Sequence, residues 1–329
     1  MTGHDACGLP VVLDVDTGVD DACALLLAAL HPGLDLRAVT CVAGNAPLPD
    51  VLRNTLTVLH LAGRPEVPVA AGAPRPLLEA PGDARHVHGT DGMADLGLPA
   101  PPTPPDPRHA VEVLRAAVEE GAAAGRPVTL VPLAPMTNVA LLARLHPRSF
   151  ARLARVVFMG GGAQVSNATA AAEFNVFHDP EAAAIVLDAC AACGVPVTMY
   201  GLDVFDGPRV TRAQADRLRA TGTPAARLAA DLVAFQQRRF TADGATLGDT
   251  GAVASLLVPE ALRTERRPVR VELTGTWTRG RTIVDTRDWG GGLAHDPHGP
   301  APAMVDVALE VDGPRVAGLW LRTVAGEQP

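Results

Sequence analysis

Lysine is absent from this chain of 329 residues, so the combined count of 28 lysines and arginines consists entirely of arginine. Asp and Glu number 36, and the formal net charge is −8. A surface that binds nucleic acid needs excess positive charge to neutralise phosphates, so this balance argues against a nucleic-acid partner. Aromatic residues make up only 3% of the chain although hydrophobic residues reach 47%, so alanine, valine and leucine must fill the core.

Long apolar runs are also missing from the sequence. No stretch reaches the roughly 20 apolar residues that a membrane-spanning helix needs. Residues 1–9 lack the basic start and apolar run of a secretory signal. The five cysteines are an odd number, which fits a reducing compartment, and the lone pair Cys190 and Cys193 is best explained by chance spacing. We therefore expect a cytoplasmic protein without a membrane partner.

Short apolar runs and helical patterns alternate along most of the chain, which predicts an α/β fold. Strands are expected at residues 11–13, 35–43, 67–72, 127–131, 156–159 and 195–200. Helices are expected at residues 22–30, 51–62, 109–124, 137–145 and 180–191. This alternation is typical of an open, mostly parallel sheet with helices on both faces.

The carboxyl-terminal part is expected to extend the same sheet. Residues 211–240 have a helical pattern that is interrupted at residues 222–224, and a last helix is expected near residues 314–324. Extra edge strands are expected at residues 269–276, 282–286 and 302–310. No linker-like composition divides the chain, so we expect a single domain over residues 1–329.

An acidic segment joins the first strand to the first helix. Asp14, Asp16, Asp20 and Asp21 fall within eight residues, and Gly18 between them gives the backbone freedom to turn. Ligands bind at the carboxyl ends of strands in such sheets, and four crowded carboxylates need a positive partner. Ca²⁺ or Mg²⁺ with oxygen ligands is the simplest candidate. The alternative, a solvated turn with a helix-capping Asp, explains one or two of these carboxylates but not four.

Polar or flexible residues follow three further strands. Asn45 comes after Gly44, Leu133 precedes Ala134-Pro135, and Met159 precedes three glycines that could also form a plain turn. Because the ends of parallel strands meet at one crevice, we expect these segments to lie together.

The segment after the glycines adds small hydrogen-bonding groups. Asn167, Glu173 and Asn175 are suited to sugar hydroxyls, although a surface loop would carry the same residue types. Asp179 precedes Pro180 and is best explained as the cap of the next helix.

Taken together, these motifs resemble those of the inosine–uridine-type nucleoside hydrolases. The matching segments are Asp14-x-Asp16-x-Gly18-x-Asp20-Asp21, residues 42–45, residues 130–138, and the blocks Gly-Gly-Gly, Asn-Ala-Thr, Ala-Glu-Phe-Asn and Asp-Pro-Glu-Ala-Ala within residues 160–183. The resemblance runs in order from residue 11 to about residue 285. Asp14-x-Asp16 also resembles the haloacid-dehalogenase-type phosphatases, but that family predicts none of the later segments and needs a downstream lysine.

The resemblance implies an N-glycosidase that cleaves ribonucleosides to ribose and free base, a reaction of purine and pyrimidine salvage. It implies a Ca²⁺ ion bound by Asp16, Asp21, the carbonyl of Leu133 and Asp249, with Asp16 also the general base for the Ca²⁺-bound water. It implies ribose contacts from Asp20 and Asn45 at the 2′ and 3′ side, and from Asn167, Glu173, Asn175 and Met159 at the 5′ end. Asp14 is expected to brace the loop. Similar proteins are commonly homodimers or homotetramers.

One position departs from the family pattern. Gly248 stands where familiar members carry a histidine that helps to protonate the leaving base. Such protonation typically contributes ~10²–10⁴-fold in rate. His88 is our substitute candidate, and the alternative is an exposed loop histidine. Weaker candidates for base contacts are His86, Arg238, Arg239 and Phe240.

This departure leaves three hypotheses open. The protein is a nucleoside hydrolase with an altered base preference, a hydrolase of another ribosyl compound whose leaving group needs less help, or a nucleoside-binding protein with little turnover. Asp16 argues against the last, because a protein that only binds has no need of a general base.

Overall fold

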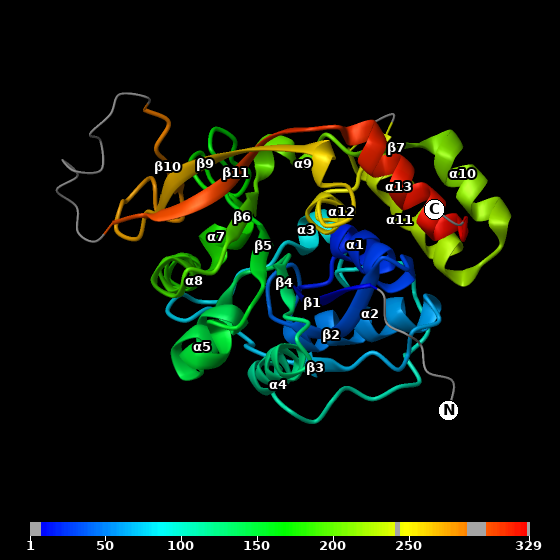
Figure 1. Ribbon diagram of the computed structural model, residues 1–329. Helices are drawn as coiled ribbons and strands as arrows, with labels where there is room; N and C mark the ends of the chain where they lie inside the picture. Colours follow the sequence, from blue (N-terminus) through cyan, green and yellow to red (C-terminus); the bar gives the residue numbers. More distant parts are fainter. Residues whose placement is uncertain (1–7, 241–243, 288–300, 328–329) are drawn as a thin grey trace.

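A mostly parallel sheet forms the centre of the protein, whose computed structural model describes residues 8–240, 244–287 and 301–327 (Figure 1). Within these residues the nine strands lie in the order β10-β9-β11-β6-β5-β4-β1-β2-β3. They are β1 (Leu9–Val15), β2 (Leu34–Cys41), β3 (Val69–Ala71), β4 (Thr129–Pro132), β5 (Arg155–Met159), β6 (Val197–Tyr200), β9 (Leu262–Val271), β10 (Thr282–Val284) and β11 (Ala303–Val311). β1 pairs in parallel with both β2 and β4. The strand order therefore reverses at β1, with β2 and β3 on one side of it and β4 and the later strands on the other. Ligands bind at such a switch point in open α/β sheets.

Helices cover both faces of the sheet, as expected. One face carries α1 (Val19–Leu30), α2 (Leu48–Leu61) and α12 (Thr250–Ala254). Outside these helices pack α11 (Pro224–Phe240) and α13 (Gly313–Ala325), and α10 (Arg212–Thr221) packs on α11 and α13. The other face carries α4 (Ala110–Ala123), α5 (Thr137–Leu145), α6 (Pro147–Phe150) and α8 (Pro180–Cys193). Each face therefore has its own apolar core, the first under α1 and α2 and the second under α4, α5 and α8. Alternate residues of β1 supply them, because Val11, Leu13 and Val15 enter the first core while Val12 enters the second.

The carboxyl-terminal strands do extend one edge of the sheet, and β9 is the strand that runs antiparallel to its neighbours β10 and β11. The expected strand at residues 269–276 was partly wrong, since β9 begins at Leu262 and ends at Val271. The carboxylate of Glu272 accepts the N–H groups of Thr274 (2.8 Å) and Gly275 (3.0 Å), and this turn ends the strand. The start was missed because residues 262–268 are mostly charged and half exposed.

Several short elements complete the described chain. They are α3 (Arg85–His88), α7 (Phe174–His178), α9 (Leu202–Phe205), the 3-10 turn η1 (Pro259–Ala261), and a separate antiparallel pair, β7 (Arg209–Thr211) and β8 (Gly244–Thr246). The predicted break in the helical pattern is confirmed, because Gly222 adopts a left-handed φ of +79° at the end of α10. No helix in the described ranges is both long and apolar enough to cross a membrane. The expectation of a single domain over residues 1–329 includes residues outside these ranges, namely 1–7, 241–243, 288–300 and 328–329, and stays a prediction. The expectation that no secretory signal is present falls mostly on residues 1–7 and also stays a prediction.

Candidate active site

Asp14, at the end of β1, is braced inside the second core. Its Oδ1 accepts hydrogen bonds from Thr40 Oγ1 (2.6 Å) and from Asn138 Nδ2 (2.8 Å). The Asn138 side chain also accepts the N–H of Ala73 and donates to the backbone carbonyl of Cys41, so it ties the end of β2 and the segment after β3 to β1. This geometry gives Asp14 a structural position, in agreement with the role expected for it.

Asp16 lies two residues further along the chain, directly after β1, and is held by Asn45. The Asn45 backbone N–H donates to Asp16 Oδ2 (2.7 Å) and its side-chain amide donates to Asp16 Oδ1 (3.1 Å) and to Asp21 Oδ2 (3.1 Å). A Cβ on Gly44 would lie 2.0 Å from Asp16 Oδ2, so only glycine allows this close approach of the backbone. The segment that follows β2, with Gly44 and Asn45, therefore fixes the carboxylate of Asp16.

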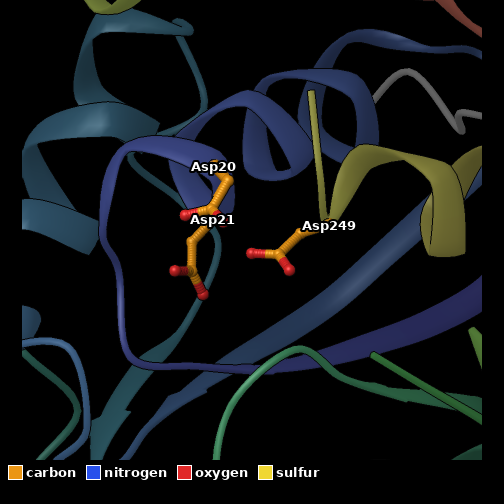
Figure 2. A group of neighbouring side chains, drawn as sticks. All are labelled: Asp20, Asp21 and Asp249. Carbon is orange, nitrogen blue, oxygen red and sulfur yellow. The ribbon is translucent and has the colours of Figure 1, made fainter. Parts of the chain in front are cut away.

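Asp20, Asp21 and Asp249 form an acidic cluster in which one carboxylate oxygen of each lies within 4.8 Å of the others. Figure 2 shows Asp20 and Asp21 at the start of α1 and Asp249 just before α12, with the three side chains directed toward a common region. Asp21 also accepts the backbone N–H of Gly18 (2.9 Å), which fixes its position at the helix start. The Oδ1 atom of Asp20 is buried and has no hydrogen-bond partner among the described residues.

Burial and mutual repulsion raise the pKa values of these carboxyl groups. Burial, with the neighbouring charge of Asp20, raises the pKa of Asp21 to about 7. The same two causes raise the pKa of Asp249 well above its usual range, and burial with the charge of Asp21 does so for Asp16. A cation among these oxygens would favour the ionised forms. Hard oxygen donors and an unpartnered buried oxygen fit a divalent cation such as Ca²⁺ or Mg²⁺.

A cavity of about 900 Å³ opens above this cluster. The predicted site residues on its wall are Asp20, Asn45, His88, Leu133, Met159, Asn167, Glu173, Asn175 and Asp249. Asp16 and Asp21 are fully buried and lie outside this lining. The fold therefore brings the predicted residues together, with two aspartates beneath the wall.

The residues expected at the ribose 5′ end are organised around α7. Glu173 accepts N–H groups from Gly161 (2.8 Å), Asn175 (2.8 Å) and Val176 (3.0 Å), and burial raises its pKa to about 7. The Asn175 amide donates to the carbonyl oxygen of Leu133 (3.0 Å). Gly161 has a φ of +67°, a conformation that glycine adopts without strain, and its N–H is one of the three that Glu173 accepts. These side chains are buried, unlike those of a surface loop.

Asn167 and Met159 contact the same region differently. Asn167 is exposed, and its Oδ1 accepts the backbone N–H of Phe174 (2.9 Å). Met159 is buried, and its carbonyl oxygen accepts the Asn175 amide (3.2 Å). Asp179 caps α8 through the N–H of Ala182 (3.1 Å), as expected.

His88 is buried, so the alternative of an exposed loop histidine was wrong. Its Nδ1 accepts the backbone N–H of Val19 (3.2 Å) and lies 3.7 Å from Asp20 Oδ1. This bond leaves the proton on Nε2 when the ring is neutral. Burial lowers the pKa of His88, so the neutral form dominates near pH 7. A Cβ on Gly18 would lie 2.6 Å from His88 Nδ1, which explains the glycine there.

The weaker candidates divide into two groups. His86 and Phe240 line the cavity, whereas Arg238 and Arg239 do not. Arg239 Nε donates instead to the carbonyl oxygen of His86 (3.0 Å), so it connects α11 to α3. The sequence reasoning missed Phe205, which lines the cavity from the end of α9, although a rare aromatic residue soon after a strand end was an available signal.

A family model described as inosine-uridine preferring nucleoside hydrolase matches residues 11–318. The chain belongs to this nucleoside hydrolase family. It is therefore an N-glycosidase that hydrolyses ribonucleosides to ribose and free base, and the phosphatase alternative is discarded.

Individual relatives agree with this assignment. The nucleoside hydrolase is 42% identical over 282 residues to the pyrimidine-specific ribonucleoside hydrolase RihA of Salmonella agona (strain SL483), covering 84% of this chain and 88% of that one. Its structure is similar to that of a purine-preferring ribonucleoside hydrolase from Gardnerella vaginalis, with a TM-score of 0.85, 30% identity, and coverage of 96% and 98% of the two chains. It is also similar to an inosine-guanosine nucleoside hydrolase, with a TM-score of 0.84, 29% identity, and coverage of 97% and 99%.

Proposed function

We propose that this nucleoside hydrolase acts with a bound Ca²⁺ ion and with Asp16 as the general base. The observation that carries the proposal is the convergence of Asp20, Asp21 and Asp249 beside Asp16 at the base of the cavity. Two buried carboxylates and the half-buried Asp20 repel one another at this distance, and a bound cation offsets that cost.

The cation would be held by Asp16, Asp21, Asp249 and the carbonyl oxygen of Leu133, with Asp20 close enough to share in binding it or the ribose. Mixed carboxylate and carbonyl ligands suit Ca²⁺ better than Mg²⁺, which demands a stricter octahedron. When bound, the ion supplies positive charge that lowers the pKa of a coordinated water. Asn45 orients both Asp16 and Asp21 toward this region through its amide.

The remaining residues would bind and polarise the ribose. Breaking the N-glycosidic bond develops positive charge on the sugar ring, and the carboxylates of Asp20 and Glu173 stabilise charge that develops near them. Asn45 would contact the 2′ and 3′ side of ribose, while Asn167 and Asn175 would contact its 5′-hydroxyl beside Met159. Asp16 accepts a proton from the attacking water. His88 donates a hydrogen bond from Nε2 to the leaving group.

The relatives do not decide which nucleobase this enzyme prefers, because they include a pyrimidine-specific and a purine-preferring enzyme. A release assay over inosine, adenosine, guanosine, uridine and cytidine, with and without a chelator, would define it. We expect base release that the chelator stops. Saturable nucleoside binding without release of base would support the alternative of a binding protein.

Asp16→Ala tests the proposed base directly. We expect turnover to fall by ~10²-fold or more, because an acid–base group typically contributes that much. Asp188→Ala, which removes an exposed carboxylate on α8, is the matched control and should leave turnover unchanged. A near-normal kcat in Asp16→Ala would contradict the assignment.

We further propose a cytoplasmic homodimer or homotetramer. The four described cysteines, Cys23, Cys41, Cys190 and Cys193, are free thiols, which suits a reducing compartment. Sedimentation of the purified chain would measure the assembly, and a monomer at micromolar concentration would contradict it.

A further inference from the structure

A phenyl ring occupies the space beside Gly248. A Cβ built on Gly248 would lie 2.4 Å from Cζ and 2.7 Å from Cε2 of Phe205, and 3.1 Å from Cβ of Asp20. Gly248 also has a left-handed φ of +48°. Phe205 and a side chain at position 248 therefore exclude each other, and here the ring takes the place beside Asp20.

The segment that carries the ring is anchored on both sides. Asp203, in α9, accepts the backbone N–H groups of Ala163 (2.6 Å) and Gln164 (2.9 Å). Asp206, directly after the ring, accepts the hydroxyl of Thr246 (3.0 Å). Phe205 itself is half-buried against the first core. These contacts keep the ring in place as a fixed part of the cavity wall.

The Phe205 ring lines the same cavity as the residues proposed to bind ribose. Phe235 and Phe240 of α11 line the cavity together with Phe205, and Glu173, the N-cap of α7, and Asn175 line it as well. His88 also lies beside Asp20, with its Nδ1 3.7 Å from Asp20 Oδ1. A leaving group attached to ribose over the acidic cluster would thus have two neighbours beside Asp20, a phenyl ring, which has no N–H or O–H to donate, and His88.

Charge in the cavity favours a positive ligand. Six carboxylates line it, against two guanidinium groups. Arg279 is paired with Glu79 and Glu181, and Arg209 donates to the carbonyl oxygen of Gly244. A cationic ring would therefore meet negative surroundings and could stack on an aromatic face.

We infer that Phe205 is a specificity-determining residue that packs against the leaving group, and that the enzyme favours ribosides whose leaving group departs neutral without taking up a proton. The simplest members of this class are N-ribosyl pyridinium compounds, and the inference rests on the proposed ribosyl hydrolysis. The bond between C1′ and the ring nitrogen breaks, and its electron pair neutralises the positive nitrogen. Water forms the new C1′–O bond and loses one proton to Asp16 and then to solvent. The products are ribose, a neutral pyridine and a proton.

The test compares kcat/KM of the full-length, Ca²⁺-supplied enzyme on nicotinamide riboside, uridine and inosine. We expect a preference for the pyridinium riboside of about 100-fold, because uridine and inosine need a proton on the leaving base, and beside the phenyl wall they receive only a hydrogen bond from the neutral His88. Phe205→Ala should reduce that preference by about 10-fold through loss of cation–π stacking. Phe177→Ala, which removes another ring lining the cavity, is the control and should leave the ratio unchanged.

A double variant provides an independent check. Phe205→Ala with Gly248→His opens the space and adds an N–H donor, and histidine tolerates a left-handed φ better than most residues. We expect kcat/KM on uridine to rise relative to nicotinamide riboside by about 10-fold or more. Equal wild-type rates on all three ribosides would overturn the inference while leaving the hydrolase function intact. Cleavage of none of them would instead overturn the proposed function, and the inference with it.

Discussion

Asp249→Asn should stabilise the protein when divalent cations are removed, although it takes away a proposed metal ligand. The oxygens of Asp20, Asp21 and Asp249 lie within 4.8 Å of one another. Two unit charges at that distance repel by about 3 kcal/mol at an effective dielectric constant of 20. Proton uptake relieves part of this repulsion, so we expect the variant to gain about 1–3 kcal/mol.

The gain should depend on pH in a definite direction. Burial and neighbouring carboxylates raise the pKa of Asp249 in the folded protein. A carboxyl group with a raised folded pKa contributes its full stability below its unfolded pKa and loses it as the pH rises through the folded value. Asparagine does not titrate, so the advantage of Asp249→Asn should be small at pH 5 and largest at pH 8.

Thermal unfolding in EDTA and in millimolar CaCl₂ measures both effects. In EDTA at pH 8 the Tm of Asp249→Asn should exceed that of the wild type by about 2–6 °C. Ca²⁺ at about 1,000 times its Kd should stabilise the wild type by about 4 kcal/mol, and the variant much less. Asp188→Asn, an exposed carboxamide change on α8, should behave as wild type. A variant that is less stable in EDTA, or that keeps the whole Ca²⁺ effect, would refute the reasoning.

Three further predictions concern single side chains. Asn138→Ala should lower the free energy of unfolding by about 3–5 kcal/mol, because the buried amide bonds Asp14 and two backbone groups; a loss below about 1 kcal/mol in urea unfolding would contradict this. His88→Ala should slow uridine and inosine cleavage by ~10²-fold but spare nicotinamide riboside; a uniform effect would remove His88 from leaving-group chemistry. Burial raises the pKa of Glu173 to about 7, so its stabilisation relative to Glu173→Gln should be full below about pH 4.5 and fall by about 3 kcal/mol as the pH rises through 7. Unfolding at pH 4.5, 6 and 8 checks this last sign, and a difference that grows with pH would refute it.

The sheet and the acidic elbow could be predicted because strong local signals specify them. β-branched runs, helical periodicity and Gly222 located the main strands, most helices and the break before α11. β7 and β8 have three residues each, too few for a periodic pattern. The start of β9 was missed because its arginines and Glu265 do not alternate with apolar residues.

The sequence shows which segments meet at the strand ends, but it does not show which of their carboxylates lie close together. Asp20 and Asp21 are adjacent at the start of α1, so their side chains point about 100° apart around the helix. Whether either meets Asp249 depends on how α12 packs against α1, and no local pattern encodes that contact. Phe205 was missed for a related reason, since α9 has four residues and its position is set by contacts of Asp203 with a distant loop.

The floor of the cavity and its outer wall are held by different kinds of contact. This difference determines which residues can change substrate preference without disturbing the fold. Asp16 and Asp21 are held by backbone N–H groups and by Asn45, next to β1, where the strand order reverses. A substitution there disturbs the fold as well as the chemistry. The outer wall comes from α3, α9 and α11, which lie in connections between strands and carry Phe205 and His88. Loops tolerate exchange far better than strand ends. Relatives with this fold are named for different bases, which is the pattern expected when the base is selected by such a wall. Substrate preference should therefore change with substitutions at Phe205 and its neighbours, because the aspartates are suited to the ribose of any riboside.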